Sequence, residues 1–134
     1  MRRVFADTHF YIALLNREDS AHRRVVHFLA DRHIEAIVTT RWVLVELANT
    51  MAKSRRRLEC GRFIEGLTEN LDCKVIGLSD ALQDRGLRLY LDRADKGWSL
   101  TDCISFIVMA DEGLTEALTA DHHFEQAGFT ALLA

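Results

Sequence analysis

Proline is absent from the 134 residues of this chain, and no lysine or arginine follows Lys96. The sequence also has no Ser- or Gly-rich stretch and no internal repeat, so it predicts neither a linker nor a disordered tail. No run approaches the roughly 20 apolar residues that a membrane-spanning helix needs. With 49% hydrophobic residues, these absences favour a single globular domain over residues 1–134, without a membrane segment.

Cysteine is scarce, and its spacing does not predict a disulfide framework or a zinc site. Cys60, Cys73 and Cys103 are odd in number and far apart, and two of them fall in apolar helical patterns, which is typical of thiols in a core. The start of the chain, two arginines and an apolar run, imitates a secretion signal. Polar residues such as Asp7 interrupt that run, and no convincing cleavage site closes it. We therefore expect a cytoplasmic protein.

Charge is unevenly distributed along the chain, although the net charge is only −3. Residues 1–98 hold 17 basic and 14 acidic residues, whereas residues 99–134 hold no basic and six acidic ones. The densest basic run comprises Lys53, Arg55, Arg56 and Arg57. Such a run is either a solvated helix end or a contact to a nucleic-acid backbone, and the sequence leaves both interpretations open.

Four acidic residues occur in or directly after apolar stretches, namely Asp7, Glu46, Asp102 and Asp121. Two unit charges about 4 Å apart repel by roughly 4 kcal/mol at an effective dielectric constant of about 20. Four acids that converge therefore need a cation, or several must stay protonated. Hard oxygen ligands select Mg²⁺ or Mn²⁺. The set predicts a metal-dependent phosphoryl-transfer enzyme, and a nuclease above all.

Short apolar stretches alternate with helical patterns, which predicts an α/β fold with a parallel sheet. Such sheets bind ligands beyond the carboxyl ends of their strands, where the strand order reverses. Asp7 ends the first expected strand, and Asp121 follows the fourth. If those strands are neighbours, both acids face one crevice. The expected strands are 3–6, 36–39, 74–78, 116–119 and 129–132, and a central helix is expected from residue 41 to about 54.

Each acid also has a purely structural explanation. The three aspartates lie near expected helix starts, where a carboxylate caps the helix, and Ser99 to Asp102 fits a capping-box pattern. Glu46 lies inside its helix, where the alternative is a buried ion pair with an arginine. His122 and His123 follow Asp121 directly, and we expect them at the surface or in a supporting role, because adjacent side chains diverge around a helix.

Four motifs together resemble those of PIN-domain ribonucleases, most closely the toxin subunits of VapBC-type toxin–antitoxin pairs. Their order and spacing match over essentially the whole chain. The motifs are Ala6-Asp7-Thr8, Val45-Glu46-Leu47-Ala48, Trp98-Ser99-Leu100-Thr101-Asp102-Cys103 and Thr119-Ala120-Asp121-His122-His123-Phe124.

The resemblance implies a three-layer α/β/α fold with a five-stranded parallel sheet in the order 3-2-1-4-5. It implies that the four acids bind Mg²⁺ or Mn²⁺ and cleave RNA, with the hydroxyl of Thr119 or Thr8 holding the first acid. Homodimers and a small antitoxin partner that blocks the site are implied as well. Asp95 is a further candidate for a supporting role. On this reading Arg55, Arg56 and Arg57 are candidate RNA contacts.

Two other functions compete with a toxin endoribonuclease. A housekeeping PIN-domain nuclease of RNA processing would carry the same acids, and a neighbouring reading frame for an antitoxin would separate the two. A receiver-type phosphoacceptor domain also uses Asp residues, Mg²⁺ and a doubly wound sheet. It needs an Asp at the end of the third strand and a Lys near the end of the sheet. The run Val75-Ile76-Gly77-Leu78 ends without that Asp, and no Lys follows Lys96.

Overall fold

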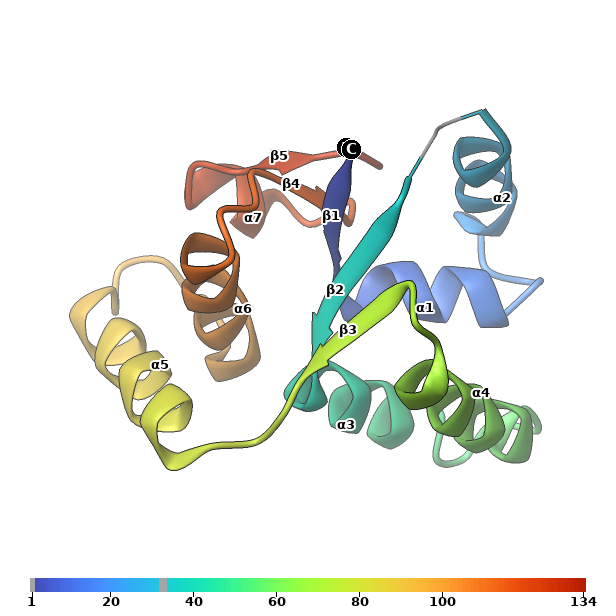
Figure 1. The fold of residues 1–134 in the computed structure, drawn as a ribbon, viewed down its shortest axis with the longest axis horizontal. Helices are drawn as coiled ribbons and strands as arrows, with labels where there is room; N and C mark the ends of the chain where they lie inside the picture. The colour runs from blue at the N-terminus through green and yellow to red at the C-terminus, as the bar shows by residue number, and fades with distance from the viewer. Residues whose placement is uncertain (1, 32–33) are drawn as a thin grey trace.

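The computed structural model describes residues 2–31 and 34–134, which form five strands and seven helices. Figure 1 shows them in chain order. The strands are β1 Arg3–Ala6, β2 Ala36–Thr40, β3 Cys73–Ile76, β4 Glu116–Leu118 and β5 Thr130–Ala131. The helices are α1 Thr8–Leu15, α2 His22–Asp31, α3 Arg41–Thr50, α4 Arg57–Glu69, α5 Asp80–Asp92, α6 Leu100–Asp111 and α7 His122–Gln126.

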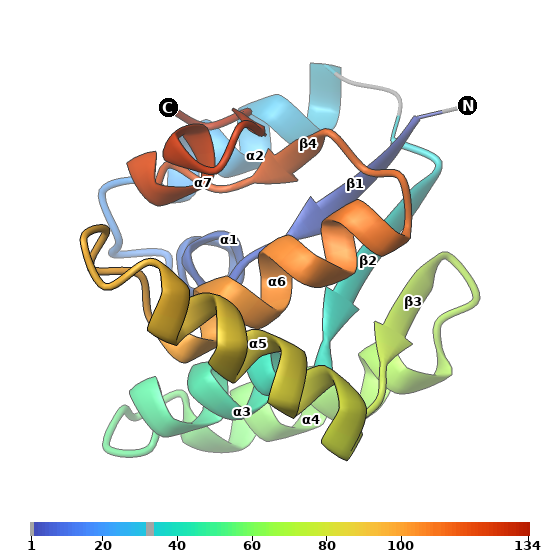
Figure 2. The ribbon, with the colours of Figure 1, turned by 90° about the vertical axis from the view of Figure 1, so that its left-hand side faces the viewer.

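All five strands lie in one parallel sheet, in the order β3-β2-β1-β4-β5, as the resemblance implied. The central strand β1 pairs with β2 on one side and with β4 on the other, where Phe5 is the partner of Val38 and of Ala117. The helices α5 and α6 cover one face, while α1, α2 and α4 lie on the other (Figures 1 and 2). The strand order reverses between β1 and β4, so their carboxyl ends open at the switch point.

The core is densest around β1 and α6. Residues 4–6 of β1 are completely buried, and seven of the twelve residues of α6 are buried, as expected of a helix that is apolar nearly all round. Phe106 of α6 packs edge-on against Phe124 of α7, with ring centroids 4.9 Å apart, and against Trp98 at 5.0 Å. These ring contacts fix α7 and its N-cap residue Asp121 against α6.

Several element boundaries differ from the sequence expectation. Helix α3 ends at Thr50 instead of near residue 54, because Asn49 and Thr50 are weak helix formers and the chain then turns until α4. Of the basic run, Lys53, Arg55 and Arg56 therefore lie in a turn, and Arg57 begins α4. Strand β3 ends at Ile76 instead of residue 78. The last strand covers only Thr130–Ala131. Within the described residues, no helix is both long and apolar enough to cross a membrane.

Candidate metal centre

Asp7 follows β1 directly and is the most deeply buried of the four acids, with 3% of its surface exposed. It occupies the N-cap position of α1, yet its side chain makes no capping hydrogen bond. Its Oδ2 instead accepts a hydrogen bond from the Thr119 hydroxyl at 3.1 Å. The pKa of Asp7 is raised to about 7, mainly by burial and also by the charge of Asp102, while hydrogen bonds from Thr8 and Thr119 and the charge of His9 lower it. This carboxyl group is therefore poorly solvated, and His9 is the positive partner that acts on it.

Thr119 links two of the acids. The residue comes directly after β4 and is completely buried. Its hydroxyl donates to Asp7 and accepts a hydrogen bond from the backbone N–H of Asp121 at 3.0 Å. A second hydroxyl, that of Thr8, donates to Oε1 of Glu46 at 2.5 Å. Of the two threonines that the resemblance suggested for the first acid, Thr119 contacts Asp7, while Thr8 contacts Glu46.

Asp102 lies in the first turn of α6 and closes a capping box with Ser99. Its Oδ2 accepts from the Ser99 N–H at 3.2 Å and lies 3.2 Å from Nδ1 of His123. Burial raises the pKa of Asp102; the Ser99 backbone hydrogen bond opposes this rise, and the charge of Asp121 adds to it. Asp121 in turn caps α7, where its Oδ1 accepts from the N–H of His123 at 2.9 Å.

The structural and the ligand interpretations therefore coexist for Asp102 and Asp121. Capping uses only Oδ2 of Asp102 and only Oδ1 of Asp121. In the part of the chain that the structure describes, the other oxygen of each carboxylate accepts no hydrogen bond. A carboxylate can therefore cap its helix with one oxygen and present the second to a ligand.

The acids meet where β1 and β4 end. Oxygens of Asp7 and Asp121 and a ring nitrogen of His9 all lie within 4.8 Å of one another, as do ligand atoms of Asp121, His122 and His123. Asp102 lies outside both groups but interacts electrostatically with Asp7 and Asp121. Glu46 also lies outside them, and its carboxylate accepts from the hydroxyl of Thr8, the residue after Asp7.

The donor set of this cluster fits a hard divalent cation. Among the described residues, no Lys or Arg nitrogen lies within 4.0 Å of the four acids; Asp102 and Asp121 pair only with the rings of His122 and His123. Within the same residues, Glu46 has no arginine partner for the buried ion pair that the sequence left open. Carboxylate oxygens without hydrogen bonds, in a site where burial disfavours negative charge, are suited to Mg²⁺ or Mn²⁺.

Two groups of sequence candidates lie elsewhere. Asp95 is exposed and accepts from Arg93 at 3.1 Å, and among the described residues no hydrogen bond joins it to the acids. Arg55 forms an ion pair with Glu18, and Arg56 lies 4.0 Å from the same carboxylate. The guanidinium group of Arg57, at the start of α4, donates to a backbone carbonyl at 2.9 Å. The arginines thus border the loop between α1 and α2.

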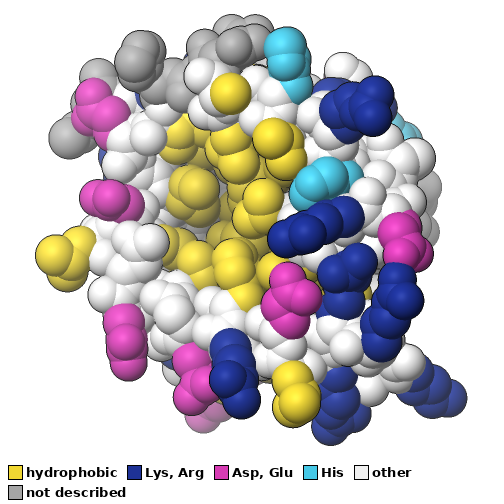
Figure 3. Space-filling model, turned by 90° about the vertical axis from the view of Figure 1, so that its right-hand side faces the viewer, with side chains coloured by type: hydrophobic (Ala, Val, Ile, Leu, Met, Phe, Trp, Pro, Cys, Tyr) yellow, Lys and Arg dark blue, Asp and Glu magenta, His cyan; other side chains and the backbone are white. Residues whose placement is uncertain are grey.

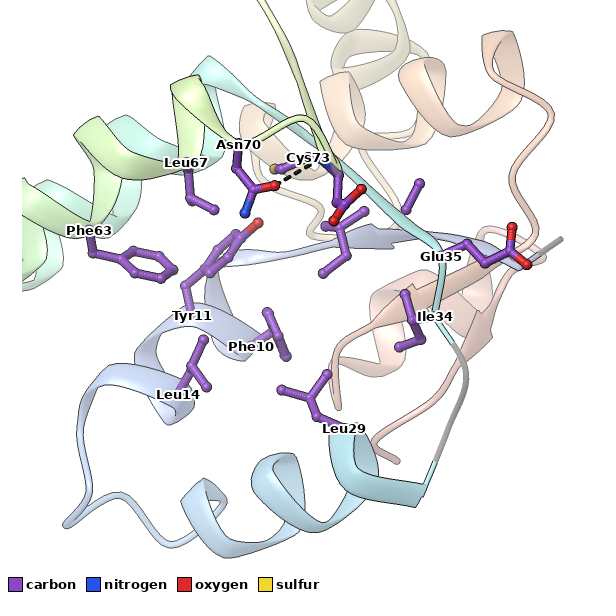
Figure 4. Close-up of a pocket in the computed structure, with 13 residues that line it drawn as sticks. Phe10, Tyr11, Leu14, Leu29, Ile34, Glu35, Phe63, Leu67, Asn70 and Cys73 are labelled. Carbon is purple, nitrogen blue, oxygen red and sulfur yellow. Dashed lines mark hydrogen bonds between the residues drawn. The ribbon is translucent and has the colours of Figure 1, made fainter.

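A second feature is an apolar groove of about 290 Å³ on the face formed by α1, α2 and α4. Figure 3 shows this hydrophobic depression with Lys and Arg side chains along one side. In Figure 4 the side chains of α1, α2 and α4 converge on it from three directions. Its apolar lining includes Phe10, Tyr11, Leu14, Leu29, Phe63 and Leu67.

The model of the PIN domain family matches residues 4–130. The chain belongs to the PIN domain family. This confirms the resemblance drawn from the sequence. A comparison with curated proteins finds no match.

Solved structures of other proteins share this PIN domain fold. VapC20 of Mycobacterium tuberculosis, a toxin that cleaves the sarcin-ricin loop, is 22% identical with a TM-score of 0.87, over 96% of this chain and 98% of its own. FitAcB of Neisseria gonorrhoeae is 17% identical with a TM-score of 0.64, over 96% and 94%. VapBC2 of Rickettsia felis, bound to a DNA fragment from its promoter, is 15% identical with a TM-score of 0.64, over 96% of both chains.

Three histidines, His9, His122 and His123, lie beside the acids of this PIN domain. His123 was expected at the surface or in a supporting role, and the structure places its Nδ1 against Asp102. His9 received no role from the sequence, because it lacks the spacing of helical zinc ligands. The available signal was its position two residues after Asp7, in the first turn of the helix that begins at the site.

Proposed function

We propose that this PIN domain is a Mg²⁺- or Mn²⁺-dependent endoribonuclease and the toxin of a type II toxin–antitoxin pair. The convergence of Asp7, Asp102 and Asp121 beyond the ends of β1 and β4, without a neighbouring lysine or arginine in the described residues, carries this proposal. Membership of the PIN family and the fold shared with VapC20 support the nuclease and toxin assignments.

Asp7, Glu46, Asp102 and Asp121 are the proposed ligands. A bound ion would polarise the scissile phosphodiester and lower the pKa of an attacking water. Three neighbours orient the carboxylates. The Thr119 hydroxyl fixes Asp7, the Thr8 hydroxyl fixes Glu46, and the ring of His123 contacts Asp102. Asp95, which pairs with Arg93, has no part in this arrangement.

The proposal is tested by incubating the purified protein with RNA in Mg²⁺, in Mn²⁺ and in excess EDTA. We expect cleavage only with metal, leaving a 3′-hydroxyl and a 5′-phosphate. Asp7→Asn should reduce cleavage at least about 100-fold, because even residues that only orient metal ligands contribute 10–100-fold. Cleavage that continues unchanged in EDTA would rule out the metal-dependent mechanism.

The RNA contact that we propose is the exposed basic turn before α4. The side chain of Arg55 is 76% exposed, and only the carboxylate of Glu18 pairs with it among the described residues. Replacing Arg55, Arg56 and Arg57 by Ala should weaken RNA binding. The slope of log affinity against log salt should fall by about 0.7 for each lost phosphate contact. An unchanged slope would remove this turn from the RNA path.

The proposed antitoxin would bind the apolar groove between α1, α2 and α4. Its apolar residues would fill the groove, and its acidic residues would face the basic side chains that Figure 3 shows beside it. The fold shared with VapBC2 supports such a partner. We expect a reading frame that encodes this antitoxin beside the gene of the PIN domain. Leu67→Asp should prevent capture of the encoded protein, whereas Leu78→Asp, at an exposed position outside the groove lining, should not.

The oligomeric state and location complete the proposal. Exposed apolar side chains on α5, among them Leu87, Tyr90 and Leu91, support a homodimer, which analytical ultracentrifugation would detect. Three free cysteines support a reducing, cytoplasmic location. If no antitoxin frame accompanies the gene and expression does not arrest growth, the housekeeping nuclease becomes the better assignment.

A further inference from the structure

The first observation is the position of His9 at the acid cluster. It is the second residue of α1 and is exposed. One of its ring nitrogens lies within 4.8 Å of an oxygen of Asp7 and of an oxygen of Asp121. Among the described residues, no hydrogen bond or ion pair occupies this ring. A nitrogen lone pair is therefore available between two acids that come from different strand ends.

The other two histidines near the cluster differ from His9. The Nδ1 atom of His123 lies 3.2 Å from Asp102 and 3.4 Å from Asp121. With an ionised carboxylate as acceptor, Nδ1 carries the hydrogen, and only Nε2 of this ring remains as a possible ligand atom. The side chain of His122 is 71% exposed, and its Nδ1 faces the same Asp121 oxygen that caps α7, at 3.7 Å. His123 is thus already engaged by two acids, whereas no hydrogen bond holds the ring of His9 among the described residues.

The spacing of the His9 group fits a shared ion. Two ligands on opposite sides of an ion that bonds at about 2.1 Å lie about 4.2 Å apart. The ligand atoms of Asp7, His9 and Asp121 all lie within 4.8 Å of one another, so their separations permit a shared ion. The exposed imidazole can rotate toward such an ion, while the Thr119 hydroxyl holds the side chain of Asp7 and the backbone N–H of Asp121.

We propose that His9 is a nitrogen ligand of the catalytic cation, bound together with Asp7 and Asp121, and that it makes the site selective for Mn²⁺ over Mg²⁺. The inference rests on the metal centre of the proposed function and specifies its chemistry. Mg²⁺ takes oxygen ligands and gives up its waters reluctantly, whereas Mn²⁺, although it is the weakest binder of the first-row transition metals, accepts an imidazole nitrogen more readily than Mg²⁺ does. Adding one nitrogen to a set of carboxylate oxygens therefore shifts the preference of the site toward Mn²⁺.

A direct test is pulsed electron paramagnetic resonance of Mn²⁺ bound to the purified, metal-free protein. A coordinated imidazole couples its nitrogen nuclei to the electron spin of Mn²⁺. We expect ¹⁴N modulation in the wild type and its replacement by a ¹⁵N pattern when histidine is ¹⁵N-labelled. His9→Ala and His9→Gln should both remove the histidine signal, and His122→Ala should keep it. Circular dichroism would show that each variant is folded.

Calorimetric titration with each metal gives a second readout. His9→Gln should weaken Mn²⁺ binding by about tenfold and Mg²⁺ binding by less than about twofold, because only the nitrogen is lost. Equal losses for both ions would contradict the proposed selectivity.

The outcomes separate the inference from the function on which it rests. Mn²⁺ that binds the wild type without any histidine coupling would overturn the role of His9 and leave the acid centre standing. Coupling that survives in His9→Ala but disappears in His123→Ala would overturn it as well, since another histidine would be the ligand. A wild type that binds neither ion would overturn the metal centre itself.

Discussion

The two ends of the sheet differ in how their acidic side chains are paired with basic ones. At the amino ends of the strands, Arg2 donates two hydrogen bonds of 3.1 Å to Glu116, and Lys74 lies 2.8 Å from Glu112. At the carboxyl ends, Asp7 and its acidic neighbours have no such cation within the described residues. The amino end therefore pairs Glu112 and Glu116 with Lys or Arg, whereas the carboxyl end gathers acids that have no Lys or Arg partner among the described residues and partly buries them.

The pKa values follow this difference. The Lys74 ammonium lowers the pKa of Glu112, so ionisation of Glu112 is favoured by folding. Burial raises the pKa of Asp7 to about 7, so ionisation of Asp7 is disfavoured by folding. A buried acid whose ionisation is disfavoured, such as Asp7, lowers the stability of the fold at neutral pH, so stability alone does not explain it. This arrangement supports the cation site that we propose at the carboxyl ends of β1 and β4.

The largest expected effect comes from neutralising Asp7 in the metal-free protein. Its pKa is higher in the fold than in the unfolded chain, so the wild type loses stability as pH rises from about 4 to about 7. Asp7→Asn removes this loss and keeps an acceptor for Thr119. The variant should be more stable than the wild type by up to about 4 kcal/mol at pH 8, and by little at pH 4. Urea denaturation in EDTA at both pH values measures this difference.

The control for that experiment is Glu116→Gln at the opposite end of the sheet. Glu116 is partly exposed and paired with Arg2, so its loss should destabilise the protein by at most about 1 kcal/mol. If both amide variants are destabilised alike at pH 8, the two ends do not differ and the comparison fails.

Thr119→Val tests how firmly the acids are positioned. The substitution conserves shape but leaves the Asp121 N–H without its acceptor and Asp7 without its donor. We expect a loss of about 1–3 kcal/mol in stability and of 10–100-fold in Mn²⁺ affinity. Thr39→Val is the matched control, because Thr39 is equally buried and donates only to the carbonyl of Ala6. A similar loss of metal affinity in both variants would assign the effect to packing.

Glu46→Gln should have the smallest effect on stability. Glu46 accepts from Thr8, and a glutamine carbonyl can accept the same hydrogen bond. We expect less than about 1 kcal/mol in the metal-free protein, whereas breaking a buried ion pair costs about 3–5 kcal/mol. Metal affinity, measured by calorimetry, should decrease. A large loss of stability with unchanged affinity would make Glu46 a structural residue.

Much of this arrangement could be predicted from the sequence. The alternation of apolar stretches and helical patterns predicted the α/β class, and the resemblance of the four motifs to PIN domains implied the strand order, which the structure confirms. Long, strongly apolar elements such as α6 were located well, because burial on all sides leaves a clear pattern. Element ends were less accurate, since a turn such as the one after Thr50 depends on weak local preferences.

The details of the site required the structure. No sequence pattern predicts that Thr119 contacts both Asp7 and Asp121, or that Thr8 donates to Glu46. The Thr119–Asp7 contact joins residues 112 positions apart and the Thr8–Glu46 contact residues 38 positions apart, while the contact of Thr119 with Asp121 depends on the turn after β4. The position of His9 beside Asp121 depends in the same way on the pairing of β1 with β4. The ion pair between Arg55 and Glu18 could not be predicted either, because it depends on how the loop between α1 and α2 folds.

The most direct test of the unpaired acids is a calorimetric titration of the metal-free protein with Mn²⁺ at pH 8, for the wild type, Asp7→Asn and Glu116→Gln. If the carboxyl ends of β1 and β4 form a cation site, the wild type and Glu116→Gln bind Mn²⁺ saturably with similar affinity, and Asp7→Asn loses most of that affinity. Absence of saturable binding in the wild type, or equal binding by all three proteins, would contradict the account.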